Sequence, residues 1–448
     1  MNSHLSSLFF LFFRRCFFCL SLLTIFASFL PSTESDLRAE EYSALEVFYQ
    51  DLNGPSWLVL PSDIAWNFGD DAEASDPCDG WMGITCNNEN TSLVMLALPS
   101  RQLSGELATD SFQEFIALRV LILTNNSIYG DFPTSAIQSQ NISMIMLDQN
   151  HFSGTIALSS SVMSVLSMRA LNLSYNNFEG DISFVYQMPS LEVLVLDENR
   201  FTGSIHPSIS GLQHLRLFTS MENPLSGTIP TAIAELSELE GLNLASCGLS
   251  GTVPTEISGL TKLRYFRLDF NYLSGSLEGV FSPAQTGLEL VDLSNNAFTG
   301  NLPSQLFQLP PIRILSLLKN SFHGSIPNTI CGLNNLELLS LSGLTAAEST
   351  LIPRYMDGGI PGCVFNMTNL RVFHAAGNGF RGTINSLHPD SKLQDLSISH
   401  NIFTGYVPQS IQSQNFTTLD ISYNKFHGTF QPNGHDHSSD SIYINFNR

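Results

Sequence analysis

Apolar residues recur along most of this chain with two periods, a short one inside each segment and a long one between segments. Within residues 171–180 the order is apolar, variable, apolar, two variable residues, asparagine, variable, apolar, variable, glycine. The same order returns at residues 194–203 and 291–300, and its asparagine position recurs every 23–26 residues, with one interval of 34. Self-similarity at such a period predicts a stack of similar units.

The alternating apolar pair in each unit predicts a short strand whose inward side chains enter a shared core. An unpaired buried amide costs about 1–3 kcal/mol, so an inward asparagine after each strand is predicted to satisfy the backbone there. Cys247 takes this position in one unit, where a small thiol with weak hydrogen bonding fits. Stacking predicts an asparagine ladder made of Asn126, Asn150, Asn176, Asn199, Asn223, Asn271, Asn296, Asn320, Asn378, Asn401 and Asn424.

Several units continue from the glycine into Gly-x-Ile-Pro or a close variant, as at residues 227–230, 251–254 and 324–327. Together with the asparagine turn, this sequence resembles plant-type leucine-rich repeats over residues 93–448. The resemblance implies an α/β fold, a right-handed leucine-rich repeat solenoid with a parallel concave β-sheet. About fifteen repeats are expected, with the last one incomplete.

Residues 36–92 are predicted to cap the first repeat, which would otherwise expose an apolar end and an open strand edge. The segment combines a short amphipathic helix at residues 36–51 with a tryptophan- and glycine-rich stretch that holds Cys78 and Cys86. It looks like the N-terminal cap of the same family, with its paired cysteines.

Residues 1–35 are predicted to be a signal peptide, because Arg14 and Arg15 precede fifteen uncharged residues. The alternative is an uncleaved N-terminal anchor. Either one predicts a secreted or cell-surface protein that meets a membrane only through an anchor at its N-terminus or outside this chain.

Secretion permits disulfides and N-glycosylation. The expected disulfide residues are Cys78 with Cys86 and Cys331 with Cys363, and two buried free thiols are the alternative for the second pair. The expected glycosylation sites are Asn90, Asn141, Asn366 and Asn415.

The formal charge of −21 argues against nucleic acid and against an anionic membrane surface, since both require a basic face. Residues 377–382 match the Gly-x-Gly-x-x-Gly pattern, but they belong to the repeat and no βαβ unit surrounds them. We find no nucleophile elbow, kinase signature or metal-ligand set. The sequence therefore predicts no catalytic residue, no metal and no cofactor, and we do not expect an enzyme.

The residues that flank each inward pair are predicted to line a concave surface on the order of 70 Å long. Acids predominate there in the middle units, which favours a cationic partner, although acidic residues also keep such surfaces soluble. Residues 344–358 form either a binding loop or a tolerated insertion. The candidate ligand-binding residues are Asp148, Tyr175, Asp197, Met221, Glu222, Arg267, Asp269, Phe270 and Asp292.

The resemblance implies extracellular recognition by a receptor-like ectodomain that binds a peptide, glycan or protein on its concave face, with a co-receptor as a further partner. Two alternatives stay open. One is a secreted inhibitor of a cell-wall-degrading enzyme, similar to polygalacturonase-inhibiting proteins. The other is a passive adhesion protein of the cell wall.

Overall fold

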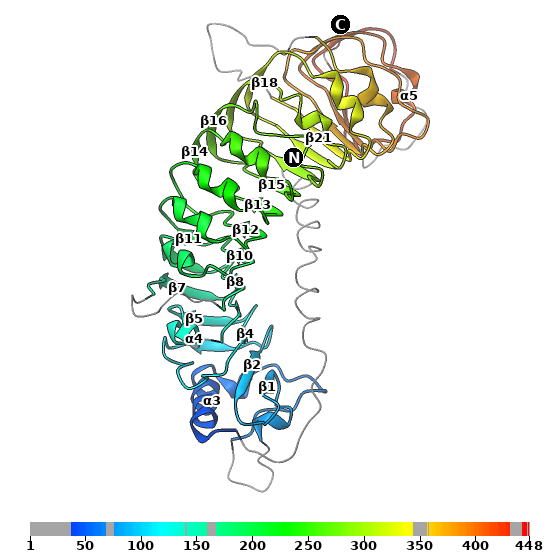
Figure 1. Ribbon diagram of the computed structural model, residues 1–448. Coiled ribbons are helices and arrows are strands. Elements are labelled where there is room, and N and C mark those ends of the chain that lie inside the picture. Colours follow the sequence, from blue (N-terminus) through cyan, green and yellow to red (C-terminus); the bar gives the residue numbers. More distant parts are fainter. Residues whose placement is uncertain are drawn as a thin grey trace.

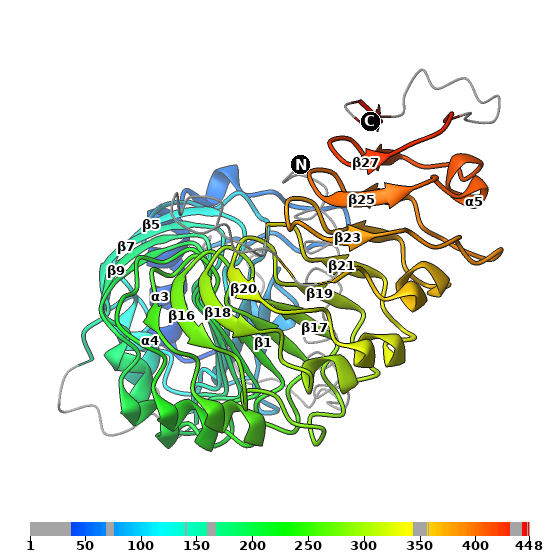
Figure 2. The same ribbon diagram turned by 90° about the horizontal axis from the view of Figure 1, so that it is seen from above.

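The computed structural model describes residues 37–68, 76–138, 141–158, 167–343, 356, 358–430, 441–445 and 447. The predicted signal peptide and most of the insertion at 344–358 lie outside the described residues. The described units stack into a long curved solenoid, with the N-terminal cap at one end (Figure 1). Seen along its length, successive units are also rotated relative to one another (Figure 2).

One sheet lines the inner side of the solenoid, because every unit contributes a short strand to it. β1 pairs antiparallel with β2, and all later neighbours are parallel and in register. Its strands, in order, are β1 (Ile84–Cys86), β2 (Leu93–Ala97), β4 (Val120–Ile122), β6 (Met144–Met146), β8 (Ala170–Asn172), β10 (Val193–Val195), β12 (Leu217–Thr219), β13 (Gly241–Asn243), β15 (Tyr265–Arg267), β17 (Leu290–Asp292), β19 (Ile314–Ser316), β21 (Leu338–Ser340), β22 (Val372–His374), β24 (Asp395–Ser397), β26 (Thr418–Asp420) and β28 (Ser441–Tyr443).

Three smaller parallel sheets follow the asparagine turns. They consist of β3 (Ser104–Glu106), β5 (Ser127–Gly130), β7 (His151–Thr155), β9 (Asn177–Gly180) and β11 (Arg200–Phe201); of β14 (Ser250–Gly251), β16 (Tyr272–Ser276), β18 (Ala297–Asn301) and β20 (Ser321–His323); and of β23 (Arg381–Gly382), β25 (Ile402–Gly405) and β27 (Lys425–Phe426).

Short helices carry the chain back to the next strand on the outer side (Figure 2). The α-helices are α3 (Ala39–Asp51) in the cap, α4 (Thr134–Gln138) and α5 (Gln409–Gln412). The 3-10 helices are Gly54–Ser56, Pro77–Asp79, Ser183–Gln187, Pro207–Gly211, Thr231–Glu235, Thr255–Gly259, Leu306–Gln308, Asn328–Gly332 and Gly362–Asn366.

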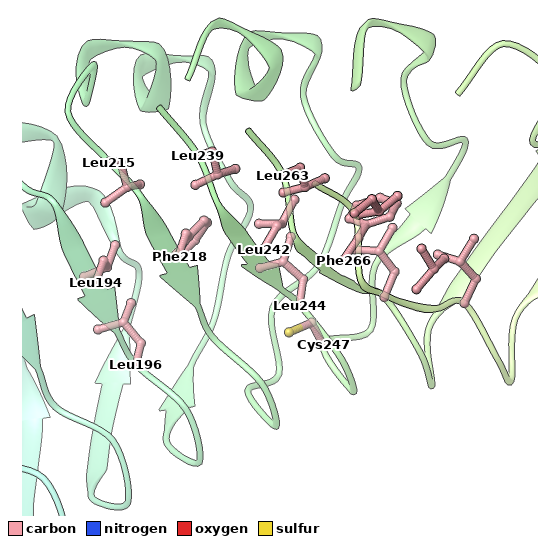
Figure 3. Close-up of a cluster of buried hydrophobic side chains, with 14 of the residues drawn as sticks. Leu194, Leu196, Leu215, Phe218, Leu239, Leu242, Leu244, Cys247, Leu263 and Phe266 are labelled. Carbon is pink, nitrogen blue, oxygen red and sulfur yellow. The ribbon is translucent and has the colours of Figure 1, made fainter. Parts of the chain in front are cut away.

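The core is a continuous stack of inward side chains, with no break between units. Leu194, Phe218, Leu242 and Phe266 lie one behind another at the centres of four adjacent strands (Figure 3). Each has at most 1% of its surface exposed. A single unit would leave this face open to water, so burial depends on the neighbouring units.

Hydrogen bonds of the asparagine ladder connect each unit to the one before it. Asn271 Nδ2 donates to the carbonyls of Leu244 (2.7 Å) and Leu268 (3.0 Å), and Asn271 Oδ1 accepts from the amides of Cys247 (3.2 Å) and Leu249 (2.8 Å). Asn401 repeats this arrangement, and Asn176 and Asn320 repeat it with one accepted amide instead of two. One buried amide therefore satisfies backbone groups of two units at once.

Cys247 replaces asparagine in a unit whose predecessor has one backbone amide fewer for a ladder oxygen to accept. The Leu225 amide, which a ladder oxygen would otherwise accept, donates to the carbonyl of Asn223 at 2.8 Å, across Pro224. The Cys247 thiol is buried and lies 3.0 Å from the carbonyl of Ser220. A proline-centred turn thus makes the thiol sufficient at this position.

Both expected cysteine pairs are joined. Cys78 is bonded to Cys86 within the cap, and Cys331 is bonded to Cys363 across the insertion, each with 5.6 Å between the Cα atoms. The alternative of two buried free thiols at the second pair is wrong.

Candidate ligand-binding surface

Each unit presents its concave side in rows that run across the strands. We call the strand residues in register with Val120 the first row; they begin every strand from β4 on, and in β2 the position is Met95. The turn row is the residue directly before each ladder position. The first row is apolar through twelve units: Met95, Val120, Met144, Ala170, Val193, Leu217, Gly241, Tyr265, Leu290, Ile314, Leu338 and Val372. Part of it forms an apolar cluster separate from the core. Sequence reasoning missed this row, although its residues stand directly before the inward leucines.

Charges alternate in sign immediately before the strands, from Arg169 to Arg371. Four ion pairs join neighbouring units there: Arg169–Glu192, Arg216–Glu240, Arg264–Glu289 and Arg313–Glu337. Partly exposed pairs contribute at most about 1 kcal/mol each. Because the sign alternates, every two neighbouring units from Arg169 to Arg371 place opposite charges side by side. Sequence reasoning also missed this period of two units.

Arg267 is the centre of the predicted site. Its guanidinium lies 3.2 Å and 3.1 Å from the two carboxylate oxygens of Asp269. Asp269 is buried, and so is Asp292 on the neighbouring strand. The sequence predicts both on the accessible concave surface, but neither is accessible there. Burial, followed by the charge of Asp269, raises the pKa of Asp292 to about 7, and Arg267 opposes that rise.

Asp197 adjoins this cluster. Its carboxylate accepts hydrogen bonds from the hydroxyl of Thr219 and, at 2.7 Å, from the amide of Met221. Burial raises the pKa of Asp197 to about 6 against the effect of those bonds, with a weaker attraction from Arg267. Asp197 is half-buried, and the Thr219 hydroxyl and the Met221 amide hold its carboxylate in place.

Accessible groups of the predicted site lie mainly in the turn row. Phe270 is 52% exposed and Glu222 is exposed, while Tyr175 and Glu198 are half-buried. Burial, followed by the charge of Glu198, raises the pKa of Tyr175, and burial followed by the same charge raises that of Glu222. Negative charge is therefore crowded at this end of the row.

Asp148 does not belong to this group. It lies five strands from Arg267, roughly 24 Å at the usual strand spacing, and is buried. Its carboxylate accepts from the hydroxyl of Thr124 at 2.8 Å, and burial raises its pKa. The structure thus groups Asp197, Met221, Glu222, Arg267, Asp269, Phe270 and Asp292 in five adjacent units. Tyr175 lies one unit further out, beside Glu198, and Asp148 lies one unit beyond that.

Replacing Asp292 with asparagine is expected to make the chain more stable at pH 8 and leave its stability at pH 4 unchanged. The folded-state pKa of Asp292 is raised, so its contribution to stability is present below about pH 4 and is lost as the pH rises through about 7. Asparagine does not ionise, so the variant should keep about 2 kcal/mol of unfolding free energy at pH 8 that the unchanged protein loses. Urea unfolding at several pH values measures it, and parallel curves for the two proteins would contradict it.

The described residues contain no helix long and apolar enough to span a membrane. Within the same ranges, no three histidine, cysteine or acidic side chains are grouped as metal ligands would be.

Comparison with known proteins places the repeats. The Leucine Rich Repeat family model matches residues 190–212, 238–260 and 287–309. Phytosulfokine receptor 1 of Arabidopsis thaliana is 28% identical over 45% of this chain and 21% of its own length, and Receptor-like protein 41 of the same plant is 35% identical over 30% and 15%. The chain spans about a fifth or less of the length of the first relatives it matches.

Solved structures agree on the fold. The crystal structure of a TDR receptor has a TM-score of 0.63 at 26% identity, over 75% of this chain and 60% of that one. The plant peptide hormone receptor RGFR1 in complex with RGF2 has a TM-score of 0.62 at 24% identity, over 76% and 60%, which supports the fold alone. With its asparagine ladder, parallel concave sheet and disulfide-bonded cap, the chain is a leucine-rich repeat protein of the plant type.

Proposed function

We propose that this chain is the recognition part of a receptor-like protein and binds a cationic peptide or protein segment on its concave face. One observation carries the proposal. The guanidinium of Arg267 interacts with four carboxylates, those of Asp197, Glu222, Asp269 and Asp292, and Glu198 adds a fifth negative charge beside Asp197 and Glu222. Crowding carboxylates around one guanidinium costs repulsion, and a cationic ligand at the accessible Glu198 and Glu222 would relieve it.

The similar proteins support this assignment. Phytosulfokine receptor 1 and the TDR receptor are receptors by name. A secreted or cell-surface location follows from the same assignment, with residues 1–35 as signal peptide, 36–92 as cap and 93–448 as repeats. The side chains of Asn141, Asn366 and Asn415 are exposed and that of Asn90 is half-buried, so we propose the first three as the principal glycan acceptors.

Replacing Glu198 and Glu222 together with lysine is expected to weaken binding of basic peptides at least tenfold. Both acids are accessible and neither forms part of the core, so the change reverses the local charge without removing a buried partner. Selection from a synthetic random dodecapeptide library, followed by calorimetry of the selected peptides at two salt concentrations, measures the effect.

The matched control is Glu256 and Glu278 to lysine, which makes the same change in net charge at exposed positions outside the concave rows. If both double variants lose the same peptide affinity, the effect comes from overall charge and not from the concave site. If the library yields no binder to the unchanged protein, the proposed function fails. Selective capture of a polygalacturonase in its place would favour the inhibitor alternative.

A further inference from the structure

One turn of the solenoid exposes two aromatic rings, which we call the aromatic pair. Phe270 is 52% exposed and Tyr272 is 75% exposed, whereas Asn271 between them is a buried ladder residue. Because the side chain between them points inward, both rings stand on the outside of the same turn. Phe270 belongs to the turn row, and Tyr272 begins β16. The units on both sides lie within the described range 167–343.

The chain gives Phe270 no aromatic neighbour. Tyr423, another exposed residue of the turn row, stacks on His400 of the preceding unit with ring centroids 4.2 Å apart. Phe270 makes no such ring contact with any described residue, and its turn-row neighbours are the polar residues Ser246 and Asn295. The amide of Asn295 turns back and donates to the hydroxyl of its own unit, at 3.3 Å. The phenyl ring therefore has a polar neighbour on each side along the row.

The backbone conformation of Phe270 does not favour phenylalanine either. Its φ is +55°, in the left-handed region, where asparagine is better tolerated than a bulky side chain. Asn125 and Asn295 occupy the same turn-row position with φ of +56° and +52°. The phenyl ring thus adds backbone strain and exposed apolar surface, and no packing within the described chain compensates for either. Contact with a partner would account for both.

The aromatic pair lies at a fixed distance from the accessible acids of the proposed site. The amide of Glu222 donates to the carbonyl of Ala245 at 3.0 Å, and the amide of Ser246 donates to that of Asp269 at 2.9 Å. These bonds hold successive turn-row residues one strand spacing apart. Glu222 and Phe270 are two strands apart, roughly 10 Å at the usual spacing. An extended peptide covers that distance in about three residues.

We propose that the aromatic pair binds a large apolar side chain of the peptide ligand, three residues away from the basic side chain that faces Glu198 and Glu222. This inference rests on the proposed function and adds a second anchor for the same peptide. Charge identifies the occupant, because the acids beside the rings attract a basic segment, whereas a second copy of this chain, with its formal charge of −21, would be repelled. The peptide lies extended along the turn row.

Replacing Phe270 with asparagine is expected to weaken binding of the selected dodecapeptides at least tenfold without lowering the melting temperature, because asparagine suits the left-handed backbone. Tyr272→Ser should weaken binding about three- to tenfold, and serine already follows the ladder position at Ser127 and Ser321. Tyr423→Asn is the matched control, an exposed aromatic residue of the turn row with φ of +53°. It lies six strands from Phe270, roughly 29 Å away, and calorimetry should show its affinity within about twofold of the unchanged protein.

Changes in the peptides locate the contact. An alanine scan of each selected dodecapeptide should find its two largest losses at a basic residue and at an apolar residue three positions away. Alanine at that apolar residue should weaken binding to the unchanged protein about tenfold or more, but binding to Phe270→Asn less than about threefold, because the contact is already lost.

Full additivity of the peptide and protein changes would overturn this inference. So would peptides that lose affinity with Glu198 and Glu222 to lysine but bind Phe270→Asn normally. Either result leaves the proposed function standing, whereas a library without any binder would overturn both.

Discussion

Replacing Asn271 with alanine is expected to lower the free energy of unfolding by about 3–5 kcal/mol. The side chain satisfies the carbonyls of Leu244 and Leu268 and the amides of Cys247 and Leu249, and it is buried. Alanine would leave these groups without the ladder partner in a region that water does not reach. Because they belong to two units, the damage extends across a unit boundary.

Urea unfolding followed by circular dichroism measures the loss, and hydrogen exchange at the Leu249 amide locates it. Cys247→Ala is the matched control at the same structural position. There the preceding unit's Leu225 amide is already bonded to Asn223, so the thiol serves one amide, that of Asn223, where the Asn271 side chain serves two, and we expect a smaller cost of about 1–2 kcal/mol. Equal costs for the two variants would show that the ladder amides contribute nothing beyond their volume.

The sequence predicts this ladder because its cause is local to each unit. An alternating apolar pair, an asparagine and a glycine four residues later specify a strand, an inward amide and a turn wherever they occur. Stacking then follows from the need to cover the apolar face. The same reasoning identifies the tolerated cysteine and the cap. It does not reveal why Cys247 is tolerated, since the bond from Leu225 to Asn223 depends on the path of the preceding unit.

Exposure on the concave face is less predictable, because it depends on curvature and on neighbours from other units. Alternation places Asp269 and Asp292 on that face, but both are buried there. Arg267 makes that burial tolerable by pairing with Asp269.

Replacing Glu41 with leucine is expected to lower the stability of the cap by about 2–4 kcal/mol. Glu41 lies on α3, is fully buried, and accepts from the amide of Leu93, the first residue of β2, at 2.6 Å. It also forms an ion pair with Arg38, whose guanidinium donates to the carbonyl of Glu114 at 2.8 Å. One carboxylate thus fastens the cap helix to the first strand of the long sheet.

Leucine would orphan the Leu93 amide and the positive charge together, whereas Glu41→Gln keeps an acceptor for the amide and loses only the charge. We therefore expect glutamine to cost about 1 kcal/mol, with hydrogen exchange at Leu93 close to that of the unchanged protein. Leucine should accelerate that exchange and expose the apolar end of the repeat stack, raising the binding of a hydrophobic dye. If the two variants unfold alike, the cap is held by its aromatic packing and disulfide, and the buried carboxylate is dispensable.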